Sequence, residues 1–161
     1  MTSRPVRRTQ DGFYSLSLPA EERSLLADLP AQMRELFANS DDPAMQRLLP
    51  VAYPNDPDRQ TEYRLLVQDE LMASHDGALS VLEETAGADR VTEEQLLAWV
   101  RAINQVRLVM GERLKITEEG AERPRSRDDP RLPGFAVYDY LSELQDDIIA
   151  ALSAGGGHED S

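Results

Sequence analysis

Apolar side chains recur along this chain at two spacings, and together they predict a mostly helical protein. Between residues 12 and 18, Tyr14, Leu16 and Leu18 alternate with more polar positions, which is the period-two pattern of a short strand. Elsewhere the apolar positions repeat every three or four residues, the spacing of a helix that buries one face. The predicted helices cover residues 19–39, 43–49, 57–85, 92–115 and 135–154.

Local signals mark where several of these helices begin. Pro43 and Pro57 each follow an aspartate, a combination favoured at helix starts because proline fits the first turn and aspartate caps it. Thr92 and Gln95 have the spacing of a capping box, in which each side chain bonds the other residue's backbone N–H. Pro30 lies inside the first helix, so we expect it to kink or split that helix.

These elements predict an all-α fold, a helical bundle of four main helices plus a short helix at 43–49, with one short N-terminal strand. The length of 161 residues suits one domain. We expect a flexible basic arm over residues 1–11, a single helical domain over 12–153 and a flexible tail over 154–161. Residues 117–133 are rich in charge and proline and predict a disordered linker. The lone strand would find a partner only in a second copy, which leaves a homodimer possible.

The helix over 92–115 carries polar residues on the side that its apolar residues define. With Leu96 at zero on a wheel of about 100° per residue, Arg107 lies at roughly 20°, Gly111 at roughly 60° and Asn104 at roughly 80°. We expect this polar stripe to face inward. A glycine inside a helix costs about 1 kcal/mol relative to alanine, so Gly111 suggests the close approach of another helix.

A buried guanidinium needs a partner, because an unpaired buried charge costs several kcal/mol. We expect Arg107 to form a structural ion pair with Glu70, at the edge of the apolar face of the preceding long helix. Glu62 is the second choice. The alternative is an arginine presented in a groove to an acidic partner.

Three residues are candidates for contact with a protein partner: Tyr53, Arg64 and Trp99. Tyr53 lies in a predicted turn, and Trp99 lies at the margin of its helix stripe. An aromatic ring in such a place either closes the core, which is the more common outcome, or anchors a partner.

The formal net charge of -13 disfavours binding to nucleic acid and to anionic lipid. Arg4, Arg7 and Arg8 in the N-terminal arm are candidate phosphate contacts. Three such contacts would give only weak and salt-sensitive affinity, so we expect DNA to be bound weakly or indirectly.

The residue types that carry most enzyme chemistry are missing or badly spaced. The chain has no cysteine, which removes disulfides, thiolate nucleophiles and zinc-thiolate sites. Its two histidines lack a second ligand at metal-binding spacing, and no phosphate loop or nucleophile elbow is present. We therefore expect a protein that is not an enzyme and has no catalytic residue, metal or cofactor. Without a long apolar run or an export signal, a cytoplasmic protein with no membrane contact is predicted.

The chain resembles one actinobacterial family in three separate runs, which are RLLPVAYPNDPDRQTEYR at 47–64, WVRAINQVRLVMGERLKIT at 99–117 and AVYDYLSELQDDII at 136–149. This family is named for the oxidative-stress transcriptional regulator AosR and is often encoded beside the ClpS adaptor. The resemblance implies a regulator that works through protein contacts, with an alternative sigma factor or RNA polymerase as partner.

Three functional hypotheses follow. The first is a cytoplasmic regulator of an oxidative-stress response that binds a sigma factor or RNA polymerase. The second is an adaptor or scaffold in Clp-dependent proteolysis, suggested by the usual gene neighbour, and the third is a weak direct DNA binder. If relatives sense oxidation through a cysteine pair, this chain cannot, and its five methionines offer only a slower, less selective chemistry.

Overall fold

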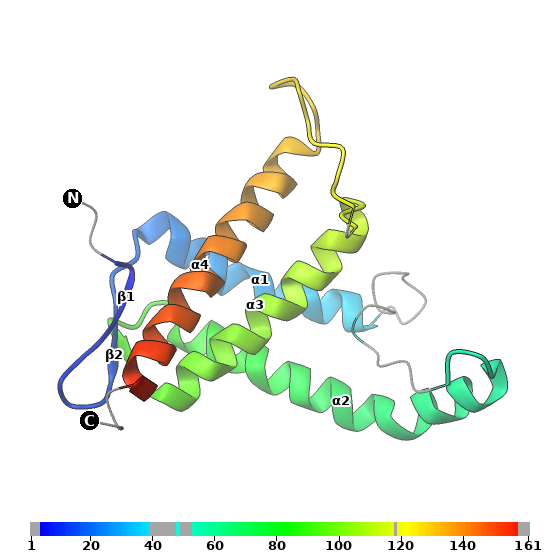
Figure 1. Ribbon diagram of the computed structural model, residues 1–161, viewed down its shortest axis with the longest axis horizontal. Coiled ribbons are helices and arrows are strands. Elements are labelled where there is room, and N and C mark those ends of the chain that lie inside the picture. Colours follow the sequence, from blue (N-terminus) through cyan, green and yellow to red (C-terminus); the bar gives the residue numbers. More distant parts are fainter. Residues whose placement is uncertain (1–3, 39–47, 49–52, 118, 158–161) are drawn as a thin grey trace.

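Four long helices make up most of the fold (Figure 1). The computed structural model describes residues 4–38, 48, 53–117 and 119–157. The helices are α1 (Ala20–Ala38), α2 (Pro57–Thr85), α3 (Glu93–Arg113) and α4 (Leu132–Gly157). The predicted helical fold with four main helices is therefore confirmed. The short helix predicted at 43–49 lies outside the described residues except for Leu48.

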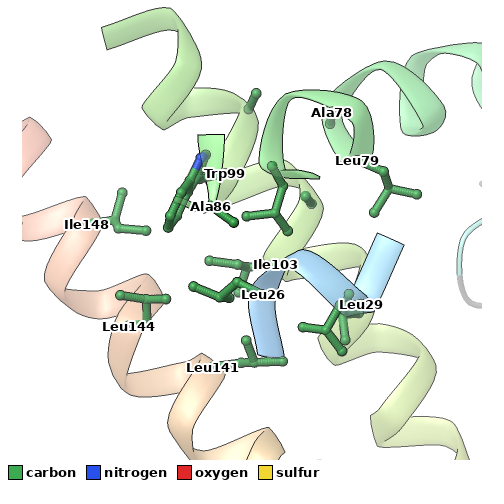
Figure 2. Packing of buried hydrophobic residues seen from close by; sticks show 14 of the residues in the cluster. Leu26, Leu29, Ala78, Leu79, Ala86, Trp99, Ile103, Leu141, Leu144 and Ile148 are labelled. Atoms are coloured by element: carbon green, nitrogen blue, oxygen red, sulfur yellow. The ribbon is translucent and has the colours of Figure 1, made fainter. Parts of the chain in front are cut away.

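Helix α3 is central, because it contacts α1, α2 and α4. Figure 2 shows Leu26 of α1 and Ile103 of α3 gathered in one core with Leu141 and Leu144 of α4. All four side chains are buried. Burying a leucine or isoleucine side chain stabilises a fold by about 1.5–3 kcal/mol, so this shared core holds the four helices together.

A small antiparallel sheet lies beside the helices (Figure 1). It consists of β1 (Val6–Arg8), β2 (Tyr14–Leu16) and β3 (Arg90–Val91), with β2 in the middle. The predicted strand is therefore present, but it pairs within its own chain and needs no second copy. The expectation of a loose arm is wrong for β1, whose Val6 is buried and whose strand contacts α4. The sequence pattern did not reveal β1 and β3, because each contains a single apolar residue and so shows no alternation.

The predicted helix starts of α2 and α3 are present as hydrogen bonds. Asp56 caps α2 by accepting a hydrogen bond from the Arg59 N–H at 3.2 Å. The capping box of α3 is complete, because Thr92 and Gln95 each accept the other's backbone N–H, at 3.1 and 2.9 Å. Pro30 does not split α1, which runs through it as one helix. The proline ring is fully buried, and this packing offsets its missing backbone hydrogen bond.

Helix α3 ends in a Schellman motif that contains no glycine at its left-handed position. Lys115 takes that position with φ 57°. The backbone N–H of Ile116 donates to the carbonyl of Gly111 at 2.8 Å, and that of Lys115 donates to Glu112 at 3.3 Å. This turn brings Ile116 back toward the end of α3.

The segment between α3 and α4 differs from the disordered linker expected at 117–133. Arg123 makes a bidentate ion pair with Asp139 of α4, with nitrogen–oxygen distances of 2.8 and 3.1 Å. This carboxylate raises the pKa of Arg123 further above its usual value. Helix α4 itself starts at Leu132, three residues before the predicted start at Phe135. A charged residue in a segment with linker-like composition thus holds that segment against α4 through an ion pair.

Candidate functional site

Arg107 joins α3 to α4 through neutral groups. Its side chain is half-buried, and its Nε donates to the Ser142 hydroxyl at 3.0 Å. One terminal nitrogen donates to the Gln145 side-chain oxygen at 2.5 Å. The guanidinium carbon also lies 5.4 Å from the centre of the Tyr138 ring, within the range of a cation–π contact. The guanidinium is thus held in a fixed orientation without a carboxylate.

The predicted ion pair between Arg107 and Glu70 or Glu62 is wrong. Both glutamates are exposed on α2, whereas the hydrogen-bond partners of Arg107 lie on α4. Neutral acceptors and an aromatic face replace the carboxylate, which is sufficient because the guanidinium keeps partial access to water.

The wheel explains this error. With Leu96 at zero, the buried Ala102 lies at roughly 240° and Val106 at roughly 280° on a helix of about 100° per residue. The core-facing arc is therefore centred well away from Leu96. The predicted inward stripe lies at the margin of this arc, so Asn104 is exposed and Gln105 is buried instead.

A pocket of about 500 Å³ opens at this margin. Its lining comes from α3, the turn that follows it, and α4, and consists of Asn104, Arg107, Leu108, Gly111, Ile116, Thr117 and Tyr138. Apart from the adjacent residues and the nearby backbone of α3, a Cβ atom added to Gly111 would meet no heavy atom of the described residues within 4 Å. The expected close approach of another helix at Gly111 is therefore wrong, and the missing side chain leaves space in the pocket.

The pocket lining carries one positive charge and no acidic residue. Asp139 follows the lining residue Tyr138 in sequence, but its carboxylate is paired with Arg123. Sequence reasoning singled out three of the lining residues, namely Asn104, Arg107 and Gly111. It missed the contribution of α4, because no local pattern tells which helix packs beside another.

The three residues predicted to contact a protein partner differ in how far they are exposed. Trp99 is 0 % exposed and donates its indole N–H to the Thr85 hydroxyl at 2.6 Å, so it closes the core. Tyr53 is exposed and meets the Tyr63 ring edge-on at 6.1 Å between centroids. Arg64 is half-buried, and its Nε has no hydrogen-bond partner among the residues that the structure describes.

A different surface on α2 is more exposed than any of these candidates. Leu65 and Leu66 are 71 % and 81 % exposed. Glu62 and Glu70 lie four residues before and after Leu66, on the same side of the helix, and both are exposed. The buried apolar residues of α2 lie in its C-terminal half, and the N-terminal half extends away from the other helices (Figure 1). We call Glu62, Leu65, Leu66 and Glu70 the leucine surface. The sequence pattern did not single out the two leucines.

The three arginines proposed to contact phosphate lie in or before the sheet. Arg4 is exposed just before β1, and Arg7 and Arg8 are exposed within it. Phosphate binding by these residues stays a prediction.

The guanidinium of Arg23, on α1, connects segments that are far apart in the chain, and the sequence analysis did not single it out. Its side chain is 18 % exposed. It donates to four backbone carbonyls, those of Leu18 at 2.9 Å, Ala88 at 2.7 Å, Leu16 at 3.0 Å and Ala86 at 3.3 Å. It therefore joins α1 to the strand β2 and to the loop between α2 and β3. Its ion pair with the exposed Asp89 carboxylate is longer, at 3.5 Å. No sequence pattern indicated the shorter contacts, because backbone carbonyls carry no residue-specific signal.

The described residues contain no group of three or more histidine or acidic side chains placed to hold a metal ion. Within the same residues, no helix combines the length and apolar character needed to cross a membrane. His75 of α2 is half-buried beside Phe37, and burial lowers its pKa below the usual value.

Residues 3–152 match the family described as "Domain of unknown function (DUF2017)". The chain is 29 % identical over 155 residues to the "Putative oxidative stress regulator AosR" of Mycobacterium leprae, covering 86 % of this chain and 70 % of that protein. It is 30 % identical over 128 residues to the "Oxidative stress regulator AosR" of Mycobacterium tuberculosis, covering 69 % of this chain and 58 % of that protein. No solved structure matches. The match spans the sheet and nearly all of the helical core, so this chain belongs to the DUF2017 family and is similar to the mycobacterial AosR proteins.

Proposed function

We propose that this protein regulates an oxidative-stress response by binding an alternative sigma factor or RNA polymerase through the leucine surface of α2. The names of the mycobacterial relatives support the regulatory role. These relatives are longer than the matched segment, which covers 70 % and 58 % of their lengths. The exposed leucines support the protein-binding role.

The leucine surface is the single observation that carries this proposal. Two adjacent leucines at 71 % and 81 % exposure leave apolar area in water, although burying one such side chain is worth about 1.5–3 kcal/mol. Single exposed apolar residues are common in folded proteins, whereas contiguous exposed apolar surface marks interaction sites, and the two leucines are adjacent.

Charge indicates what the partner surface looks like. The leucines lie between Glu62 and Glu70, and the whole chain has a net charge of -13. A complementary partner therefore presents apolar side chains bordered by lysine or arginine. Complementary charge speeds association and selects among partners, and this contribution weakens with salt.

Binding to purified actinobacterial RNA polymerase core and to purified alternative sigma factors tests the proposal. The test variant is the double substitution Leu65→Ser and Leu66→Ser. Its matched control is Ile149→Ser, because Ile149 is also an exposed apolar residue, at 45 %, but lies on α4. Biolayer interferometry gives the dissociation constants, and circular dichroism verifies that each variant folds.

We expect the wild type and Ile149→Ser to bind one of these partners with equal affinity. The double variant should bind at least about tenfold more weakly, since tenfold corresponds to about 1.4 kcal/mol, less than the burial of one leucine. If the wild type binds neither polymerase nor any sigma factor, the proposed partners are wrong. If the double variant binds as tightly as wild type, the surface is wrong.

A further inference from the structure

We propose that the pocket between α3 and α4 binds a small organic oxyanion, a carboxylate or phosphate group attached to an apolar body, through the guanidinium of Arg107. This site is separate from the leucine surface, and the proposal does not depend on the proposed partner.

The first observation is that Arg107 has fixed geometry and remaining hydrogen-bond capacity. A guanidinium has five N–H donors in one plane. Ser142 and Gln145 accept from Nε and from one terminal nitrogen, and the Tyr138 ring lies against the group. No hydrogen bond is found from the other terminal nitrogen to the described residues. An already oriented guanidinium loses little conformational freedom when it binds an anion.

The second observation is the absence of a carboxylate partner at this arginine. Arg34 contacts Asp76 and Glu83, and Arg123 contacts Asp139. Within the described part of the chain, the partners of Arg107 are all uncharged. These uncharged partners leave the positive charge of Arg107 uncompensated, although the chain as a whole has more acidic than basic residues.

The third observation is the shape and lining of the space. A volume of about 500 Å³ lies within the size range of small-molecule sites, roughly 300–1,000 Å³. Leu108, Ile116 and the Tyr138 ring provide apolar surface, while Asn104 and Thr117 provide an amide and a hydroxyl. This mixture fits an anionic head bound by Arg107 and an apolar body packed on the remaining walls. Inorganic phosphate would leave those walls without a partner.

The overall negative charge opposes the approach of any anion, but this effect is screened at the distances involved. At physiological ionic strength the Debye length is about 8 Å, so the nearest charges dominate. The carboxylate of Asp139 is paired with Arg123, and Lys115 and Glu112, which adjoin lining residues in sequence, carry opposite charges. The guanidinium of Arg107 is therefore the charge that lies in the pocket lining itself.

Three aromatic probes of similar size test the charge requirement: benzoate, phenyl phosphate and neutral benzamide. Their binding to the full chain is measured by ligand-observed NMR and by isothermal titration calorimetry. Benzoate and phenyl phosphate distinguish a carboxylate site from a phosphate site. We expect at least one of the two anions to bind about tenfold or more tightly than benzamide, because a hydrogen bond between two charged groups is roughly twice as strong as one between neutral groups.

Three variants test the location. Arg107→Gln removes the guanidinium, and Arg101→Gln is its matched control, because Arg101 is exposed on the same helix. Gly111→Leu keeps the charge but fills the space that Gly111 leaves open. We expect Arg107→Gln and Gly111→Leu each to weaken anion binding at least about tenfold and Arg101→Gln to leave it unchanged.

Several results would overturn the proposal. Failure of both anions to bind wild type would show that Arg107 only docks α3 on α4. Equal binding of benzamide and benzoate would remove the role of charge. Should Arg107→Gln fail to fold by circular dichroism, Gly111→Leu decides the location, and undiminished binding by that folded variant would place the anion elsewhere.

Discussion

Removing the Arg23 side chain tests whether one arginine holds the sheet and α1 together. Three carbonyl oxygens accept from its guanidinium at 3.0 Å or less, those of Leu16, Leu18 and Ala88. They belong to β2, to the residues before α1 and to the loop before β3. In Arg23→Ala, all three carbonyls lose their charged donor at once.

The expected loss of stability follows from these contacts. A hydrogen bond in a folded protein contributes about 1 kcal/mol net, so three bonds give about 3 kcal/mol. Bonds to a charged donor are stronger, but the Arg23 side chain is 18 % exposed, and water replaces part of what is lost. We therefore expect Arg23→Ala to lower the free energy of unfolding by about 3 kcal/mol, a large share of the roughly 5–15 kcal/mol typical of a domain.

Urea unfolding followed by circular dichroism measures this change. For a chain of this size, a loss of about 3 kcal/mol corresponds to a fall in melting temperature of roughly 6–12 °C. Arg23→Lys should fall between wild type and Arg23→Ala, because an ammonium cannot reproduce the planar set of donors. Arg101→Ala on the exposed side of α3 is the control and should stay close to wild type. If Arg23→Ala is destabilised by less than about 0.5 kcal/mol, water satisfies the three carbonyls and the reasoning fails.

Three further predictions concern the helices. Arg107→Ala should lower the free energy of unfolding by about 1–2 kcal/mol, because two interhelical hydrogen bonds are lost, whereas Arg101→Ala should change it little; equal urea midpoints would contradict this. Gly111→Ala should raise stability by about 1 kcal/mol, since its Cβ meets open space and alanine favours the helix; a lower melting temperature would disprove it. Burial lowers the pKa of His75 in the folded protein below its usual value of 6.5. The stability that neutral His75 contributes is therefore present above pH 6.5 and is lost as the pH falls from 6.5 to the folded-state pKa. The urea midpoint of wild type should therefore fall relative to that of His75→Gln between about pH 7 and pH 5, and parallel curves would refute the assignment.

Local chemistry made several elements predictable from the sequence. The capping box of Thr92 and Gln95 and the cap at Asp56 involve residues three apart, so the interacting atoms are adjacent whatever the rest of the chain does. The alternation that buries Tyr14 and Leu16 is likewise a local pattern. The resemblance to the AosR family was also visible, because three runs together carry more information than any one of them.

Local patterns could not supply the partners of the polar side chains. Arg107 was expected to meet a carboxylate of α2, but its partners Ser142 and Gln145 lie 35 and 38 residues away along the chain, on α4. The small Ala102 and the polar Gln105 belong to the buried arc of α3. An arc estimated from the large apolar residues alone is therefore centred in the wrong place.

The sequence by itself determined which segments become helices, because helix caps and apolar periodicity act within a few residues. The tertiary structure alone decided that β1 and β3 flank the predicted strand, that Arg23 binds four backbone carbonyls, and that Gly111 leaves a pocket open. These features depend on contacts between residues far apart in the chain. Their energies are realised only after the helices have packed, so no short window of sequence contains them.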